Sequence, residues 1–174
     1  AGELVRAACA RHLADLKRSD LRFDPEAAGF AMGFFPALCR HYKGEWAGEP
    51  VELLPWEAFV IGSLEGWTIR DPATGTWMRR FTRAYVEVGK KAGKTLLAAG
   101  MALRRTFFDD EEGAEGYTIA TKFALAKLVW DDADAMVAAS PELRSLIHRS
   151  VRSLSDDATR SKLRPLSAEE RGEE

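Results

Sequence analysis

"YVEVGKKAGKTLLAAGMAL", residues 85–103, is the stretch that decides the fold class. A β-branched segment leads into a turn rich in glycine and lysine, and an Ala/Leu-rich segment typical of a helix follows. Gly93, Lys94 and Thr95 stand at the start of this expected helix. In a phosphate-binding loop, backbone N–H groups converge on phosphate oxygens there, a lysine reaches the β- and γ-phosphates, and a hydroxyl holds Mg²⁺. The stretch therefore predicts a phosphate-binding loop.

The loop differs from the standard pattern at its first glycine. The pattern GxxxxGK[ST] requires a glycine at position 88, where this chain has Val88, and Gly89 follows one residue later. The β-branched segment before the loop and the Ala-rich segment after it favour phosphate binding. On the local pattern alone, a basic turn between a strand and a helix, without any ligand, stays open as the alternative.

The surrounding segments predict an α/β fold with a parallel sheet. A strand–turn–strand unit is expected over 67–88, with its turn at 71–75 and its second strand ending in "AYVEV", a buried central strand. Further strands are expected in "YTIAT" and near Leu163. The crossover from "YVEV" to "YTIA" is about 30 residues, the length of one βαβ unit. The phosphate loop would therefore follow directly on a buried strand.

Helices are expected where apolar residues recur at helical spacing between start and stop signals. Asp24 is a candidate N-cap and Pro25 a first helical residue; Pro36 is expected to kink or divide the same helix, and Gly44 to end it. The expected helices are 3–17, 25–44, 55–66, 94–106 and 122–140, with a further short helix from Ser140.

The overall composition is that of a folded globular protein. Apolar residues make up 46% and charged residues 30% of the 174 residues, and the net charge is −2. This charge gives no general attraction to nucleic acid, so a DNA contact would have to come from a local patch. No apolar run reaches transmembrane length, and no signal peptide opens the sequence. The three histidines do not have metal-ligand spacing.

Other conspicuous residues have structural interpretations. Cys9 and Cys39 are too far apart for a metal or redox motif and are expected to be small apolar residues in a reducing cytoplasm. The acidic residues at 109–112 and 131–134 predict a solvated loop and a solvated helix face. Exposed surface is expected for the arginines at 79, 80, 83, 104 and 105. Core or interface positions are expected for the tryptophans at 46, 56, 67 and 77.

Three segments together resemble the ATPase region of phage terminase large subunits, the DNA-packaging motors of tailed bacteriophages. They are the loop with its "LAAG" helix, "HYKGEWAGEPVELLPWEAFVIGSLEGW" at 41–67, and "GAEGYTIATKFALAKLVWDDADAMVAASPEL" at 113–143. The match runs from about residue 8 to about residue 167. The resemblance implies a P-loop NTPase-type parallel sheet with flanking helices. It divides the chain into a helical N-terminal segment (1–66), a nucleotide-binding core (67–167) and a polar tail (168–174).

The resemblance implies roles for individual residues. Lys94 would hold the β- and γ-phosphates, and Thr95 would ligate Mg²⁺. Lys90 occupies the place of an arginine that is a candidate for stabilising transition-state charge. The loop backbone would enclose the phosphates; its residues are Gly89, Lys91, Ala92 and Gly93. In the family a Pro-Trp-Gln motif contacts the adenine, and the corresponding residues here are Trp56 and Glu57.

The sequence departs from the family pattern at three points. Lys90 keeps the positive charge but lacks the planar fork of arginine. Glu57 replaces a glutamine, and a carboxylate can only accept hydrogen bonds; either adenine selectivity is weaker or Glu57 is a solvated helix residue. The Walker B strand, with its aspartate and catalytic glutamate, and the nuclease domain are expected beyond residue 174. The chain is therefore expected to be the N-terminal part of a terminase, and the fold to be incomplete.

The function that the resemblance implies is binding of ATP and Mg²⁺ to power the packaging of double-stranded DNA into a capsid. Its implied partners are DNA, the portal protein, the small terminase subunit and further copies in a ring, without a membrane, in the host cytoplasm. This chain alone is expected to bind nucleotide weakly and hydrolyse it poorly. A truncated, non-catalytic terminase relic that contacts DNA or protein is the alternative, and a fragment of another P-loop NTPase, such as a helicase, is a weaker one.

Overall fold

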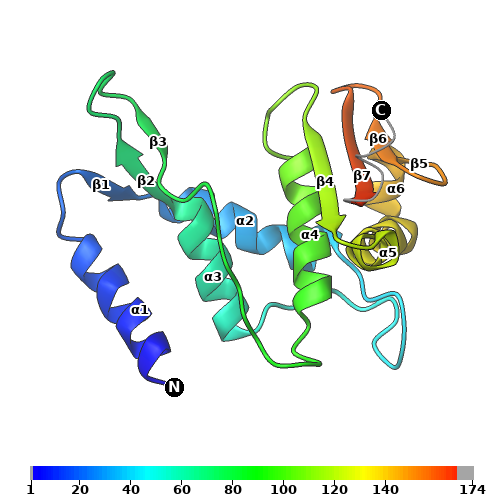
Figure 1. Cartoon of the computed structure of the whole chain (residues 1–174), viewed down its shortest axis with the longest axis horizontal. Helices are drawn as coiled ribbons and strands as arrows, with labels where there is room; N and C mark the ends of the chain where they lie inside the picture. Colours follow the sequence, from blue (N-terminus) through cyan, green and yellow to red (C-terminus); the bar gives the residue numbers. More distant parts are fainter. Residues whose placement is uncertain (1, 168–174) are drawn as a thin grey trace. The chain divides into compact units, whose positions relative to one another are not determined.

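A computed structural model describes residues 2–167 and shows a mixed α/β chain (Figure 1). The helices are α1 (Glu3–Asp15), α2 (Pro25–Leu38), α3 (Pro55–Gly66), α4 (Lys94–Phe107), α5 (Phe123–Ala139) and α6 (Pro141–Leu146). The strands are β1 (Leu21–Phe23), β2 (Trp67–Arg70), β3 (Trp77–Arg79), β4 (Glu115–Ala120), β5 (His148–Arg149), β6 (Leu154–Asp156) and β7 (Ser161–Ser167). The α/β fold class is confirmed. The polar tail expected at 168–174 lies outside the described residues.

The chain forms two compact units. Unit 1 comprises Ala1–Met32 and Leu54–Val86, and unit 2 comprises Gly33–Leu53 and Glu87–Glu174. The boundary near residue 32 falls within α2, so the helix contributes its first half to one unit and its second half to the other. The division at residues 66 and 67 that the resemblance implies stays a prediction.

Unit 1 contains a small antiparallel sheet with the strand order β1-β2-β3. Asp71 makes the turn between β2 and β3, because its carboxylate accepts the N–H of Ala73 and its backbone carbonyl accepts the N–H of Gly75. Trp67 is buried, and its indole N–H donates to Nδ1 of His12 at 3.0 Å. The expected strand–turn–strand unit is thus present, although its second strand ends at Arg79.

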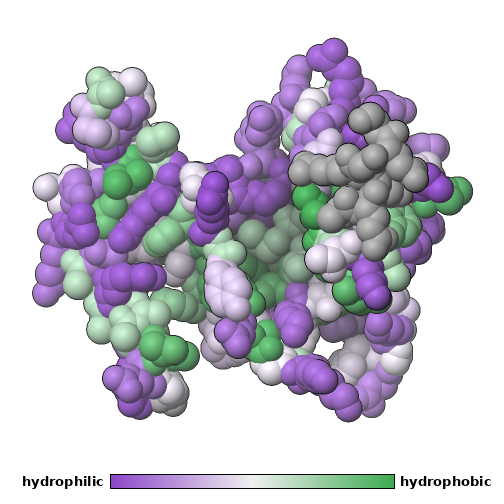
Figure 2. All heavy atoms as spheres, in the orientation of Figure 1, coloured by the Kyte–Doolittle hydropathy of each residue, from purple (hydrophilic) through white to green (hydrophobic). Residues whose placement is uncertain are grey.

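Unit 2 holds a second sheet with the order β4-β7-β6-β5. β4 and β7 run parallel, as their arrows show in Figure 1, and the other pairs are antiparallel. Both α4 and α5 pack against β4 and β7 and against each other. Fully buried side chains in this unit include Phe35, Leu103, Met136, Leu143, Leu154 and Leu163. The charged loop between α4 and β4 forms a hydrophilic projection (Figure 2).

The buried central strand expected at "AYVEV" is absent, and this prediction was wrong. Residues 84–88 form no strand; Tyr85 is 88% exposed and Val86 42% exposed. A short apolar run becomes a strand only where a neighbouring strand takes its hydrogen bonds, and neither sheet of the described residues includes this segment. The parallel pair is β4 with β7, and the connection between them runs through α5, α6, β5 and β6 rather than through α4.

The helix from Pro25 ends at Leu38, six residues before the expected stop at Gly44. It runs through Pro36 without division. Arg40 stabilises this earlier end, because its guanidinium donates to the carbonyl oxygens of Pro36, Ala37 and Cys39. Carbonyl oxygens at a helix C-terminus otherwise lack hydrogen-bond donors.

Several side chains differ from their expected exposure. Arg104 is buried near Asp109, with 3.6 Å between Nη1 and Oδ1, and Arg80 is largely covered beside Asp15, because each guanidinium forms an ion pair with a carboxylate. Trp46 and Trp77, in contrast, are exposed.

Candidate phosphate-binding site

The backbone of the loop takes two left-handed conformations before α4 begins. Lys91 has a φ of 66° and Gly93 a φ of 75°. Glycine adopts this conformation freely, whereas a lysine does so rarely, and such residues cluster at sites of function. Gly93 is the N-cap of α4, so the two conformations turn the chain sharply into the helix.

The first turn of α4 is open to an anion. The N–H of Leu97 donates to the carbonyl of Gly93 at 3.0 Å, which closes the first helical turn. Within the described residues, the N–H groups of Lys94, Thr95 and Leu96 have no acceptor, and the glycine N-cap supplies no side chain to cap them. The turn holds no acidic residue that would offset the positive end of the helix dipole. This is the arrangement that binds phosphate at helix N-termini.

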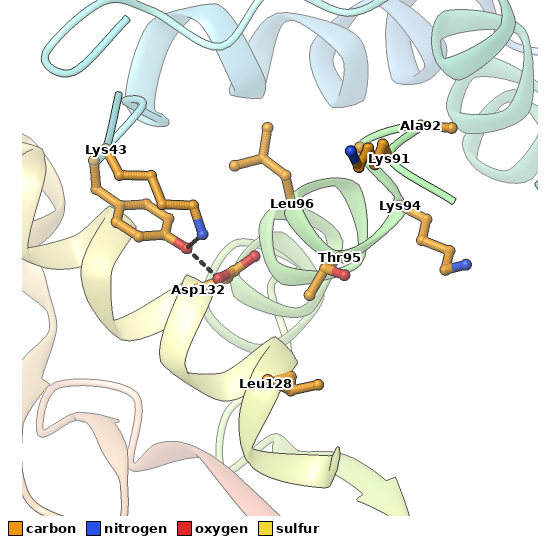
Figure 3. A pocket seen from close by; sticks show the side chains of 10 residues that line it. Lys43, Lys91, Ala92, Lys94, Thr95, Leu96, Leu128 and Asp132 are labelled. Atoms are coloured by element: carbon orange, nitrogen blue, oxygen red, sulfur yellow. Dashed lines mark hydrogen bonds between the residues drawn. The ribbon is translucent and has the colours of Figure 1, made fainter. Parts of the chain in front are cut away.

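A cavity of about 520 Å³ lies beside this helix terminus (Figure 3). Its size is that of a site for a small molecule such as a nucleotide. It is lined by Tyr42, Lys43, Lys91, Ala92, Gly93, Lys94, Thr95, Leu96, Leu128 and Asp132, all of which belong to unit 2.

The wall opposite the loop carries a chain of hydrogen bonds. The Tyr42 hydroxyl bonds to Oδ1 of Asp132 on α5, and Nζ of Lys43 donates to the Tyr42 oxygen at 2.8 Å (Figure 3). Burial, followed by the bond to the Asp132 carboxylate, raises the pKa of Tyr42 above its usual value. The tyrosine is therefore a neutral donor at physiological pH.

The structure brings most of the expected loop residues into one cavity. Lys91, Ala92, Gly93, Lys94 and Thr95 all line it. Two further expected residues do not line it: Gly89 and Lys90 are exposed. Their roles stay predictions.

The expected adenine-reading residues, Trp56 and Glu57, lie in the first turn of α3 in unit 1. Glu57 is only 7% exposed, and its Oε2 accepts the N–H of Leu54 at 2.8 Å. This is the backward bond of a helix N-terminus, which glutamate and glutamine both make. The interpretation of Glu57 as a solvated residue was therefore wrong, and its role toward adenine stays a prediction.

Tyr42, Lys43 and Asp132 were not expected at the site. The sequence suggested a solvated helix face for 131–134, which holds for the exposed Asp131 but was wrong for Asp132, a half-buried residue that bonds to Tyr42. The available signal was the four-residue spacing from Leu128 to Asp132, which puts both on one face of α5. Nothing in the sequence indicated that this face would meet residue 42.

One candidate metal ligand lies at the loop. Thr95 lines the cavity, and its side chain carries a hydroxyl, a hard oxygen ligand of the kind that Mg²⁺ prefers. Among residues 2–167 no group of three or more His, Cys, Asp or Glu side chains could hold a metal ion. A site at Thr95 fits an ion that arrives with nucleotide phosphates and keeps several waters.

Two comparisons with known proteins gave matches. The family model described as "Terminase large subunit, ATPase domain" matches residues 55–171. The crystal structure of the HK97 bacteriophage large terminase is similar in fold, with a TM-score of 0.64 and 23% sequence identity over 84% of this chain and 28% of that chain. No curated protein matches the sequence. In the part of the chain that the structure describes, every helix is too short or too polar to span a bilayer.

Proposed function

The chain belongs to the family of terminase large subunits, through their ATPase domain, and we propose that its residues 89–95 bind ATP with Mg²⁺. In the complete terminase, ATP hydrolysis would power the movement of double-stranded DNA into a capsid. The chain spans 28% of the length of the HK97 large terminase, so the activity of the whole motor is part of the proposal.

The observation that carries the proposal is the open N-terminus of α4. Three N–H groups without acceptors in the described residues, the dipole of a 14-residue helix and the ammonium group of Lys94 all favour a negative charge at one end of the cavity. A triphosphate is the ligand whose charge and length match a cationic helix terminus beside a cavity of about 520 Å³.

Each loop residue has a defined task in this proposal. The backbone from Lys91 to Gly93 encloses the phosphates, Lys94 neutralises the β- and γ-phosphates, and Thr95 supplies an oxygen to Mg²⁺. Mg²⁺ would neutralise the charge that develops on the phosphate oxygens during transfer. Lys90 would act as a point charge toward the γ-phosphate, without the bidentate geometry of an arginine.

The partners of the complete protein follow from the family. We propose double-stranded DNA as the substrate that is moved, with the portal protein, the small terminase subunit and further copies in a ring as protein partners, in the cytoplasm of the host. The net charge of −2 favours DNA contacts through a local patch rather than through the whole surface.

The test is calorimetric titration of the chain with ATP in the presence of excess Mg²⁺, with folding checked by circular dichroism. Lys94→Ala should remove most of the binding, because it deletes the phosphate-neutralising charge. Lys122→Ala is the matched control: this lysine is exposed at the N-cap of α5, outside the cavity lining, and its loss should leave the affinity unchanged.

A folded chain that binds no nucleotide would overturn the proposal. Equal affinities of the wild type and Lys94→Ala would do the same. Either result would favour the alternative, a non-catalytic terminase module that contacts DNA or protein.

A further inference from the structure

The two ends of the cavity differ in chemistry. The end formed by the loop presents Lys91, Lys94 and the N-terminus of α4. The lining outside residues 91–95 consists of the apolar Leu96 and Leu128, with the Tyr42, Lys43 and Asp132 cluster. A nucleotide has the same division, because its phosphates are anionic and its nucleoside is mainly apolar with a few hydrogen-bond donors.

Resting on the proposed function, we propose that the carboxylate of Asp132 accepts a hydrogen bond from the nucleoside part of the bound nucleotide, and that Tyr42 and Lys43 position it. The donor is an N–H of the base or an O–H of the ribose. Both groups call for the same partner, an ionised carboxylate at the nucleoside end of the cavity.

The hydrogen bonds fix the direction of every proton in the cluster. An ammonium group can only donate, so Lys43 occupies a lone pair of the Tyr42 oxygen. The single proton of the Tyr42 hydroxyl then goes to Oδ1 of Asp132. Asp132 is consequently held as an acceptor, and its pocket-lining carboxylate receives no other hydrogen bond from the described residues.

This arrangement leaves acceptor capacity for a ligand. A carboxylate has about four lone-pair sites, of which Tyr42 uses one. A negative charge close to a triphosphate would repel it, so the carboxylate is better suited to the nucleoside end than to the phosphate end. Asp132 therefore acts as a hydrogen-bond acceptor for the nucleoside, while Lys94 and the N-terminus of α4 attract the phosphates.

The experiment compares ATP with inorganic tripolyphosphate, both with Mg²⁺, by calorimetry on the full 174-residue chain. Asp132→Asn is the main variant. Tyr42 would continue to donate to the amide oxygen, so the amide NH₂ would face the nucleoside, donor against donor. We expect ATP affinity to fall by about tenfold or more, whereas tripolyphosphate affinity should stay equal or rise slightly.

Two further variants separate position from charge. Tyr42→Phe should weaken ATP binding by a smaller factor than Asp132→Asn and leave tripolyphosphate affinity unchanged. The Asp132 carboxylate is still present in this variant, but it has lost the hydrogen bond that positions it. Asp131→Asn removes the same charge from the neighbouring exposed residue, which pairs with Lys127 outside the cavity, and should leave both ligands unaffected.

The outcomes distinguish this inference from the proposed function. If Lys94→Ala removes ATP and tripolyphosphate binding but Asp132→Asn changes neither, the phosphate loop stands and the role of Asp132 is wrong. If Asp132→Asn weakens both ligands equally, Asp132 acts at the metal or the phosphates, which also overturns the inference. Failure of both ligands to bind the folded wild type would overturn both proposals. If Asp132→Asn weakens the binding of ATP alone, two analogues identify the donor. They are 2′-deoxy-ATP, which lacks the 2′-hydroxyl of the ribose, and purine riboside triphosphate, which lacks the 6-amino group of the base.

Discussion

The ring of Phe35 lies directly against the backbone of Gly100, so close that a Cβ atom on Gly100 would stand 2.4 Å from Cε1 of the ring. The contact joins the end of α2 to the middle of α4 within unit 2. It consequently fixes the start of the segment that carries Tyr42 beside the helix that follows the candidate phosphate loop.

Gly100→Ala should therefore destabilise unit 2 by about 1–3 kcal/mol, because the added methyl group overpacks a closed contact. Chemical denaturation measures the loss. Gly33→Ala is the matched control: it lies inside α2 with nothing within 4 Å of the new Cβ, and should raise stability by about 0.5–1 kcal/mol. In the double variant Phe35→Leu/Gly100→Ala, the smaller leucine side chain should restore part of the stability that Gly100→Ala loses. If the two changes in the free energy of unfolding were strictly additive, the contact between Phe35 and Gly100 would be contradicted.

The bond between Tyr42 and Asp132 should contribute to stability as well as to the site. Tyr42→Phe removes the hydroxyl from a half-buried carboxylate and should cost about 1 kcal/mol in the free energy of unfolding. Tyr117→Phe removes a hydroxyl that bonds to Glu115 on the exposed surface of β4, and should cost less. Equal losses in the two variants would show that the Tyr42 bond is solvated.

Unit 1 depends on the ion pair between Arg80 and Asp15, in which Nη1 and Oδ2 are 2.7 Å apart. The side chain of Asp15 is only 8% exposed, so Arg80→Ala would leave a buried carboxylate without its closest cation and should cost about 2–4 kcal/mol. Lys127→Ala breaks the exposed pair with Asp131 and should cost under about 0.5 kcal/mol. A small effect of Arg80→Ala would indicate that water reaches Asp15.

The two cysteines should differ in reactivity. Burial raises the pKa of the Cys39 thiol from 9.0 to about 12, whereas Cys9 is exposed. A thiol reagent at pH 8 should therefore label one cysteine rapidly in the folded chain and the second only after unfolding. Labelling of Cys39 at the rate of Cys9 would contradict its burial.

The same shift predicts a pH dependence of stability. Between pH 9 and pH 12 the unfolded chain loses the Cys39 proton while the folded chain keeps it, so stability that is complete below pH 9 declines as the pH rises. Unfolding free energies from pH 8 to pH 10 should fall less steeply in Cys39→Ala than in the wild type. Cys9→Ser should leave the slope unchanged, since Cys9 is exposed.

Helices were predicted well from the sequence because their signals are local. Pro55 and Gly66 bound α3 at the expected residues, and α4 begins at Lys94, directly after its N-cap Gly93, as the glycine and lysine pattern indicated. The strand expected at 84–88 failed because strand formation depends on a partner, and no periodicity within five residues reveals whether one is available.

Only the loop side of the candidate site was predictable from the sequence. Residues 91–95 are contiguous, so a motif could find them. Tyr42 and Asp132 are 90 residues apart in the sequence and meet only because α5 and the segment after α2 fold together in unit 2. Their bond exists only in the tertiary structure, and the sequence around each residue contains no motif that indicates a site.

The most direct test of the phosphate loop is an NMR titration of the ¹⁵N-labelled 19.3 kDa chain with ATP and Mg²⁺. The backbone amide resonances of Gly93, Lys94, Thr95 and Leu96 should shift more than those of the β1-β2-β3 sheet, because these N–H groups would donate to phosphate oxygens. Saturating nucleotide that leaves these four resonances in place would contradict the account.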